Sequence, residues 1–270
     1  MYTSAQTDNV FSITAMYTAF HESFKSDYTF AGEFHSFHEI VFVLSGRLGV
    51  TAGSDIFVLE EGQAIVHEPM EFHNLWSEGG TTPSVVVFSF GARNFPKYSS
   101  KLIRFSDTQK PLEILNLFRD SFEMRNDMFF TGIKNEGNPE YQLAVKALES
   151  FILSHIHQEL PTDAVLRTRS AQNFAKVVTV LEENLDKNLS VSDIARLCNQ
   201  GEVSLKKNFS KYSGMGVITY FNKLKVTAAI QMLREGKTVK EISNALGFSD
   251  QNYFSTVFKR IMGSSPSQYK

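Results

Sequence analysis

The stretch Gly247-Phe248-Ser249-Asp250-Gln251-Asn252-Tyr253-Phe254-Ser255-Thr256-Val257-Phe258-Lys259-Arg260 decides how the carboxyl-terminal part of this chain folds. Residues 247–250 have the composition of a tight turn. After the turn, apolar side chains recur at the spacing of one helix face, and these are Phe254, Val257 and Phe258. Gly263 stands where a left-handed glycine ends a helix. The stretch therefore predicts a turn followed by a helix that is anchored on one side.

A shorter helix is predicted immediately before that turn. Thr238 suits the N-cap position, and Glu241 stands three residues later, which is the spacing of a capping box. The residues of this helix that we expect to face inward are Ile242, Ala245 and Leu246. A helix, a tight turn and a second helix form a helix-turn-helix unit, in which the second helix enters the major groove of DNA.

The same pattern occurs a second time, earlier in the chain. Residues 190–195 parallel residues 238–243 at an offset of 48, and residues 205–209 parallel residues 254–258 at an offset of 49. One copy alone would favour an ordinary helical bundle, whereas two capped copies that each end at a glycine favour a double helix-turn-helix domain. The earlier copy has the caps Ser190 and Asp193, the expected inward residues Ile194, Leu197, Leu205 and Phe209, and the terminal Gly214.

The outward positions of the two second helices are the candidate base-reading residues. Lysine can contact the acceptors of guanine, and asparagine or glutamine can pair with adenine. Basic side chains further along each helix suit phosphate contacts. The candidate base readers are Val203, Ser204, Lys206, Lys207, Gln251, Asn252, Ser255 and Thr256, and the candidate phosphate contacts are Lys211, Lys259 and Arg260. The alternative is that these faces are only the solvated surface of a bundle.

The net charge of −2 is the average of two unlike halves. Residues 161–270 carry 16 Lys and Arg against 9 Asp and Glu, whereas residues 1–160 carry 11 against 20. Of the 24 Phe residues, 18 lie in the first half. An acidic, aromatic-rich half and a basic half indicate two domains with different partners, and the basic one has the charge that a DNA-binding domain needs.

The carboxyl-terminal half resembles the AraC/XylS family of bacterial regulators. The resemblance lies in residues 247–260, 263–269 and 189–214 and in a connecting helix over 217–233, and it covers about residues 170–270. It implies seven helices, with two helix-turn-helix units held by a rigid connecting helix and addressing adjacent major-groove segments. The chain departs from the family pattern at Thr256, Lys225 and Cys198, which affects the base preferences rather than the fold. We interpret Cys198 as a small packing residue in preference to a redox sensor.

The amino-terminal half has the pattern of a β domain. Short Val-, Ile- and Phe-rich runs between residues 11 and 90 are separated by Gly and Pro, which is typical of a sandwich or a barrel. From Pro111 the spacing becomes helical, with Leu112, Leu115, Phe118 and Phe122 first and residues 143–155 later. The fold class is therefore α+β with several domains: a β domain over 1–110, a helical segment over 111–160, a linker over 161–169 and an all-α double helix-turn-helix domain over 170–270.

The β domain resembles the cupin-type barrel that many AraC/XylS regulators carry and that senses a ligand or signal in that family. The resemblance lies in residues 35–46, 61–62, 69 and 72–73. Four of these residues could be remnants of a cupin metal site, namely His35, His38, Glu39 and His73. Their spacing departs from that of metal-binding cupins, so we expect a vestigial site with no metal and no cofactor. The candidate effector-pocket residues are His35, His38, Phe42, His73 and Trp76.

These patterns together predict a sequence-specific, ligand-responsive transcription regulator that is not an enzyme and has no catalytic residues. Its expected partners are double-stranded promoter DNA, RNA polymerase, a small-molecule effector and a second copy of the chain. The second copy is expected to pack on the helices after Pro111. The alternative is that these helices only cover the barrel of their own chain. No apolar run long enough to span a membrane and no signal peptide is evident, and a single cysteine suits the reducing cytoplasm. The alternatives are a metal-dependent cupin enzyme with a helical appendage and a repair methyltransferase fused to this module.

Overall fold

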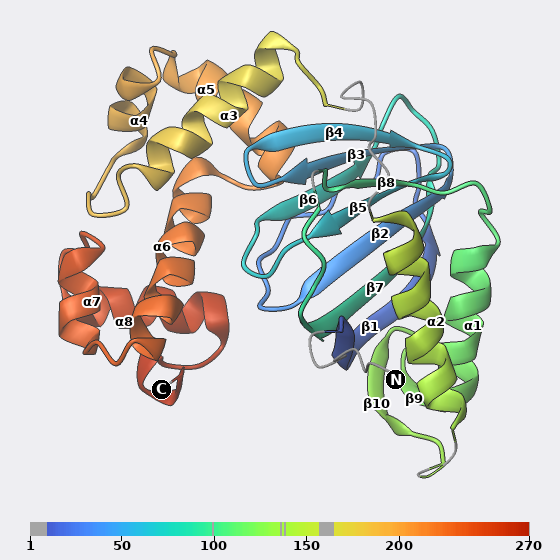
Figure 1. Cartoon of the computed structure of the whole chain (residues 1–270). Coiled ribbons are helices and arrows are strands. Elements are labelled where there is room, and N and C mark those ends of the chain that lie inside the picture. The colour runs from blue at the N-terminus through green and yellow to red at the C-terminus, as the bar shows by residue number, and fades with distance from the viewer. Residues whose placement is uncertain (1–9, 99, 136, 138, 157–164, 270) are drawn as a thin grey trace, which may run out of the picture.

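The computed structural model describes residues 10–98, 100–135, 137, 139–156 and 165–269 (Figure 1). In this part of the chain the strands of the amino-terminal domain form two sheets. The larger has the order β8-β5-β2-β7-β1-β10-β9, and the smaller has the order β4-β3-β6. The strands are β1 (Ser12–Ser23), β2 (His38–Ser45), β3 (Arg47–Ala52), β4 (Asp55–Glu60), β5 (Gln63–His67), β6 (His73–Ser77), β7 (Ser84–Arg93), β8 (Leu102–Arg104), β9 (Phe122–Arg125) and β10 (Phe129–Ile133).

The two sheets pack face to face, and the central strands of the larger sheet, β5, β2 and β7, are buried on both faces. Because side chains alternate along a strand, Val41 and Val43 of β2 join the core between the sheets, whereas Ile40 and Phe42 join the core under the helices. The sequence favoured a sandwich or barrel, and the resemblance implied a cupin-like barrel. Among the described strands the hydrogen bonds give two facing sheets and not one closed ring.

Two helices cover the outer face of the larger sheet, namely α1 (Lys110–Ser121) and α2 (Glu140–His155). Leu115, Phe118 and Phe122 are buried in the core beneath these helices, and Leu112 packs against it. These four residues therefore cover the sheet of their own chain. The sequence left two alternatives for them, packing between two protomers and covering the β domain, and the structure shows the second.

The expected helical segment over 111–160 also contains a β-hairpin, which the sequence analysis did not predict. The helical pattern was extended through Phe122, but the backbone turns extended at Phe122 and begins β9. Asn126 and Asp127 both have a positive φ, of 54° each, which is the geometry of a tight hairpin turn. The strand β10 follows this turn and lies between the two helices. Residues 161–164 of the expected linker lie outside the described residues.

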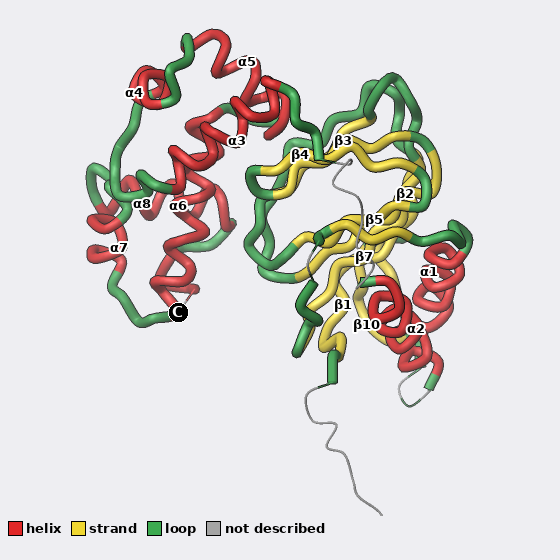
Figure 2. The backbone as a smooth tube through the Cα atoms, turned by 45° about the horizontal axis from the view of Figure 1, so that its top comes forward, coloured by secondary structure: helices red, strands yellow, loops and turns green. Residues whose placement is uncertain are grey.

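The carboxyl-terminal domain is helical, as predicted. Its described part has six α-helices and a short 3-10 helix, which together make the seven helices that the resemblance implies. They are α3 (Arg169–Glu182), α4 (Val191–Leu197), α5 (Glu202–Ser213), α6 (Val217–Arg234), α7 (Val239–Ala245), α8 (Gln251–Met262) and η2 (Pro266–Tyr269). Figure 2 shows this domain on the opposite side of the β domain from α1 and α2.

Local signals set the ends of these helices. Ser190 and Thr238 each form a complete capping box with the acid three residues later. Gly214 and Gly263 end α5 and α8 in the left-handed conformation, with φ of 66° and 75°. Both predicted helix-turn-helix units are therefore confirmed.

The predicted anchors of the second helices are buried: Leu205, Phe209, Phe254, Val257 and Phe258. The prediction for the first helices was wrong at two positions, because Leu197 is 44% exposed and Ala245 is also exposed. Ala195 and Ser243 are buried in their place. Each of these helices has only seven residues, so its inward face is one narrow stripe that leaves the last positions outside.

Candidate functional site

The outward faces of α5 and α8 form the candidate DNA-binding surface. Seven of the eight predicted base readers are exposed, and Ser255 is half-buried. Val203 is 82% exposed. Ser255 and Thr256 donate their hydroxyl hydrogens to the carbonyls of Gln251 and Asn252, which leaves their hydroxyl oxygens as acceptors. Lys211, Lys259 and Arg260 are exposed further along the two helices.

Asp250 positions the start of α8. Its carboxylate accepts hydrogen bonds from the backbone N–H groups of Asn252 and Tyr253, each at 2.8 Å, so it caps the first turn of the helix. The predicted readers Gln251 and Asn252 lie in that same turn and are exposed. A rigid first turn suits base contacts, because recognition helices present their amino-terminal residues to the groove.

Lys225 of α6 holds the two helix-turn-helix units together. Its ammonium group donates to the carbonyl of Lys187, just before α4, at 2.7 Å and to the carbonyl of Leu246, at the end of α7, at 2.6 Å. The residue is only 3% exposed. Burial lowers the pKa of Lys225 to about 8, although Asp186 partly opposes this. The connecting helix therefore fixes the relative position of the two units through a buried charge.

The first helix-turn-helix unit is docked on the smaller sheet of the β domain. The carbonyl of Tyr212, at the end of α5, accepts hydrogen bonds from Thr51 at 2.6 Å and from Asn74 at 3.2 Å. Gly214 follows, and a Cβ there would lie 2.4 Å from the carbonyl oxygen of Phe30. The two domains thus approach backbone to backbone at this point, where a larger residue would not fit.

Aromatic side chains extend this interdomain contact. Trp76, the single tryptophan of the chain, packs against Tyr212 with ring centroids 5.8 Å apart. Phe72 packs against Tyr220 of α6 at 4.7 Å. Lys223 of α6 donates to the carbonyl of Gly32 at 3.3 Å. Phe72 and Trp76 are therefore part of the same hydrophobic core as residues of α3, α5 and α6.

A cavity of about 750 Å³ lies between the two sheets, next to this contact. His35 and His73, two of the five predicted pocket residues, line it. Its wall is mostly apolar, with a group of charged residues in one region. The lining residues are Thr18, Phe20, Glu22, Ser23, Phe24, Lys25, Tyr28, Phe30, Glu33, His35, Phe37, Glu39, His73, Leu75, Val87, Ser89, Met128 and Phe129.

The other three predicted pocket residues lie elsewhere. His38 stacks on Phe95, with ring centroids 4.4 Å apart, on the opposite face of the larger sheet. Phe42 is fully buried in the core beneath α1 and α2. Trp76 belongs to the interdomain contact. The alternation of side chains along β2 explains the positions of His38 and Phe42, because the even-numbered residues of this strand point away from the cavity.

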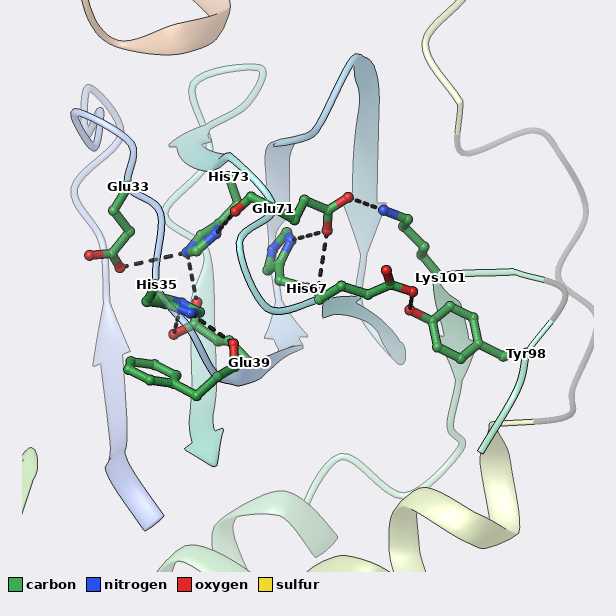
Figure 3. A network of polar contacts seen from close by, with 10 residues as sticks. Glu33, His35, Glu39, His67, Glu71, His73, Tyr98 and Lys101 are labelled. Carbon is green, nitrogen blue, oxygen red and sulfur yellow. Dashed lines mark hydrogen bonds and ion pairs between the residues drawn. The ribbon is translucent and has the colours of Figure 1, made fainter. Parts of the chain in front are cut away.

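The charged region of the cavity brings together Glu33, His35, Glu39 and His73 (Figure 3). His73 Nε2 lies 3.4 Å from Glu39 Oε1 and 3.6 Å from Glu33 Oε1, and His35 Nε2 lies 3.8 Å from Glu39 Oε2. Burial raises the pKa of the Glu39 carboxyl, but its contacts with His35, His73 and Ser89 outweigh burial and hold that pKa below its ordinary value. Glu39 is therefore an anion at neutral pH.

Sequence reasoning missed Glu33 as a member of this group. The residue lies in the segment before β2 and pairs through its backbone with His73. The spacing Glu33-x-His35, followed by Glu39 four residues later, was the signal that could have found it. A further histidine, His67, stacks on His73 at 4.4 Å, and burial, with lesser contributions from nearby positive groups, lowers its pKa well below the ordinary value.

Comparison with known proteins gives a consistent picture. Residues 194–270 match a helix-turn-helix domain family. The Msm operon regulatory protein of Streptococcus mutans is 25% identical over 258 residues, which cover 90% of this chain and 87% of that protein. The uncharacterized HTH-type transcriptional regulator YfiF of Bacillus subtilis is 23% identical over 87% of this chain and 77% of its own length.

Matches over a smaller part of this chain are also found. The HTH-type transcriptional activator RhaR of Pectobacterium carotovorum is 40% identical over 68 residues, which are 25% of this chain and 24% of that protein. Among solved structures, the C-terminal domain of AraT, a response regulator from Geobacillus stearothermophilus, is 26% identical over 38% of this chain and 86% of that chain, with a TM-score of 0.36.

Relatives that align along most of this chain are thus transcription regulators. None of the helices in the described residues is both long and apolar enough to cross a membrane. The helix-turn-helix family match, the two capped units and the named relatives agree. Residues 194–270 therefore carry an AraC-type helix-turn-helix domain, and the chain is similar to transcription regulators along most of its length.

Proposed function

We propose that this regulator reads a specific promoter sequence through α5 and α8, and that a small molecule in the cavity of the β domain controls its affinity for DNA. The observation that carries the proposal is the segment before β2, which is shared by the cavity and the interdomain contact. Phe30, Glu33 and His35 line the cavity. Gly32, between them, accepts a hydrogen bond from Lys223 of the helical domain.

The reading of DNA rests on the chemistry and exposure of the two second helices. α5 presents Lys206 and Lys207, and α8 presents Gln251 and Asn252. The first pair suits guanine, and the second pair suits adenine. Lys206 lies 3.7 Å from Glu202 one turn earlier, an exposed pair that costs little to break when DNA arrives.

The test is a gel-shift titration at fixed salt with the Lys206→Ala/Lys207→Ala double variant. We expect specific binding to weaken by at least roughly tenfold, as a base contact is worth about 1–3 kcal/mol. The matched control is Lys97→Ala/Lys110→Ala, which removes the same charge from exposed positions of the β domain. Equal affinities of the two variants would contradict the assignment of the readers.

Salt provides a second readout of the same surface. Binding of the wild type should weaken steeply between about 50 and 200 mM salt, because phosphate contacts release counterions. The Lys259→Ala/Arg260→Ala variant should show a shallower slope of log affinity against log salt. A flat response of the wild type would mean that phosphates are not contacted.

The effector proposal follows from where the cavity lies. A ligand changes an equilibrium only if it binds one arrangement better than the other. A molecule with an apolar body and a polar end fits the mostly apolar wall and the charged region beside the segment 30–37. Filling the cavity would favour one position of that segment, and therefore one arrangement of the two domains.

Trp76 allows this coupling to be measured without knowing the effector. The single tryptophan contacts Tyr212, so its emission reports on the interdomain contact. We expect promoter DNA to change the emission, and Thr51→Val, which removes the hydroxyl that donates to Tyr212, to change DNA affinity. Arg47→Ala, an exposed change on the same strand, is the control. Unchanged emission together with unchanged affinity of Thr51→Val would refute the coupling.

Two macromolecular partners belong to the same proposal. RNA polymerase would be contacted at the promoter, in the cytoplasm where the DNA lies. A second copy of the chain would pack on the outer face of α2, where Leu143 is 59% and Leu153 is 42% exposed. Light scattering should give twice the mass of one chain, and Leu143→Lys/Leu153→Lys should halve it. A wild-type monomer at tens of micromolar would exclude this dimer.

A further inference from the structure

We propose that Glu33, His35, Glu39 and His73 bind one divalent transition-metal ion. Each of these residues offers one ligand atom, and the four atoms lie within 4.8 Å of one another. From the sequence we expect a vestigial site built from His35, His38, Glu39 and His73. The structure replaces His38, which lies on the other face of the sheet, with Glu33.

The backbone fixes the tautomers of both histidines in the form that a metal requires. Nδ1 of His35 lies 2.9 Å from the carbonyl oxygen of Phe37, and Nδ1 of His73 lies 3.3 Å from that of Glu71. A carbonyl can only accept, so each Nδ1 carries a hydrogen, and Nε2 is the ring nitrogen that is left to ligate an ion. Metal-ligating histidines usually donate their other ring hydrogen in this way.

Both Nε2 atoms are buried and have no hydrogen-bond partner among the described residues. They face carboxylate oxygens instead, as Figure 3 shows. A buried ring nitrogen without a hydrogen-bond partner costs free energy. A cation between these nitrogens and the carboxylates would remove that cost.

The distances fit an ion better than direct hydrogen bonds. The three nitrogen–oxygen separations are 3.4, 3.6 and 3.8 Å, whereas a charged N–H···O bond is about 2.7–2.9 Å long. Metal–ligand bonds of about 2.0–2.1 Å in a tetrahedral site place neighbouring ligand atoms about 3.3 Å apart. A small inward movement would therefore complete the coordination. Glu33, whose side chain is 47% exposed, has the most freedom to move.

The surroundings support the ligands. Ser89 donates its hydroxyl hydrogen to Glu39 Oε2 at 2.7 Å, which fixes the carboxylate. His67 stacks on the face of His73 and keeps the ring in place. Two imidazoles with carboxylates suit Zn²⁺, Fe²⁺ and similar ions and are less suited to Ca²⁺ or Mg²⁺, which prefer oxygen alone.

The test is metal binding by the full chain after dialysis against a chelator. Titration with Co²⁺ should give visible absorption bands that saturate at one equivalent, and Zn²⁺ should abolish them. Glu33→Gln and His73→Gln should weaken Zn²⁺ binding by at least about 10- to 100-fold. The matched control His38→Gln changes a histidine of the same strand region and should bind as the wild type does.

Three results would overturn the proposal: no saturable binding by the wild type, equal binding by Glu33→Gln, or an equal loss in His38→Gln. Circular dichroism shows whether each variant is folded. If His73→Gln unfolds because the residue is buried, Glu33→Gln decides the outcome, since its side chain is half-exposed. Promoter DNA is absent from these measurements, so their result is independent of the function proposed above.

Discussion

Replacing Lys225 by Met removes the buried charge that joins the two helix-turn-helix units. The wild-type ammonium group donates to two carbonyls, those of Lys187 and Leu246. A hydrogen bond from a charged donor contributes about 1.5–3 kcal/mol, so two contribute about 3–6 kcal/mol. Methionine has a similar shape and avoids the cost of burying a charge, which offsets part of the loss. We expect a net destabilisation of about 2–4 kcal/mol.

The assay is thermal unfolding of the full chain followed by circular dichroism at 222 nm, which mainly reports the helical domain. A loss of 1 kcal/mol lowers the melting temperature of a domain of this size by about 4–8 °C, so the expected decrease is roughly 10 °C or more. Lys223→Met is the matched control, because it removes one half-buried hydrogen bond to Gly32. A melting temperature of the Lys225 variant equal to that of the control would refute the bridging role.

Lys225 should also affect how the free energy of unfolding depends on pH. Burial lowers the pKa of Lys225 in the folded chain to about 8, whereas in the unfolded chain it is about 10.4. Between these values the unfolded chain binds more protons, so this residue's contribution to stability rises with pH in that window. The stability difference between the wild type and Lys225→Met should therefore grow from pH 8 to pH 10. A difference that shrinks with pH would contradict the burial of the charge.

Three further predictions concern the helical domain. Gly247→Ala should lower the melting temperature, because Gly247 has φ +61° and a Cβ there would lie 2.1 Å from the carbonyl oxygen of Asp186; an unchanged melting temperature would show that the turn relaxes. The thiol of Cys198 should react with a thiol reagent only after unfolding, because burial raises its pKa; rapid reaction of the native chain would contradict this. Ile194 is buried and Leu197 is exposed, so Ile194→Ala should lower the free energy of unfolding by about 2–5 kcal/mol and Leu197→Ala by less than about 1 kcal/mol. Equal losses for the two variants in urea unfolding would contradict this difference in burial.

Interactions that span a few residues could be predicted from the sequence. The capping boxes of Ser190 and Thr238 close over three residues, and the glycine caps at Gly214 and Gly263 depend on one backbone conformation each. Such signals need no knowledge of the rest of the fold. The apolar spacing of α5 and α8 likewise identified their buried anchors.

The candidate site was predicted only in part. His35, Glu39 and His73 were named from the resemblance to the cupin-type barrel, but His38 and Phe42 were assigned to the pocket because the exact phase of β2 was not used. Glu33 was not named, because its backbone pairing with His73 joins positions 40 residues apart. The hairpin at Asn126 and Asp127 was missed because the helical spacing of the preceding residues continued through Phe122.

The sequence by itself determined the two helix-turn-helix units and the outward positions of their second helices, since local hydrogen bonds and helical periodicity encode both, and its composition gave the basic charge of the domain that carries them. Only the tertiary structure decided that Lys225 joins the units, that Tyr212 docks the first unit on the β domain, and that four residues converge on one possible metal site. These contacts bring together segments that are far apart in the chain. Their partners are chosen by packing between sheets and helices, which no local pattern records.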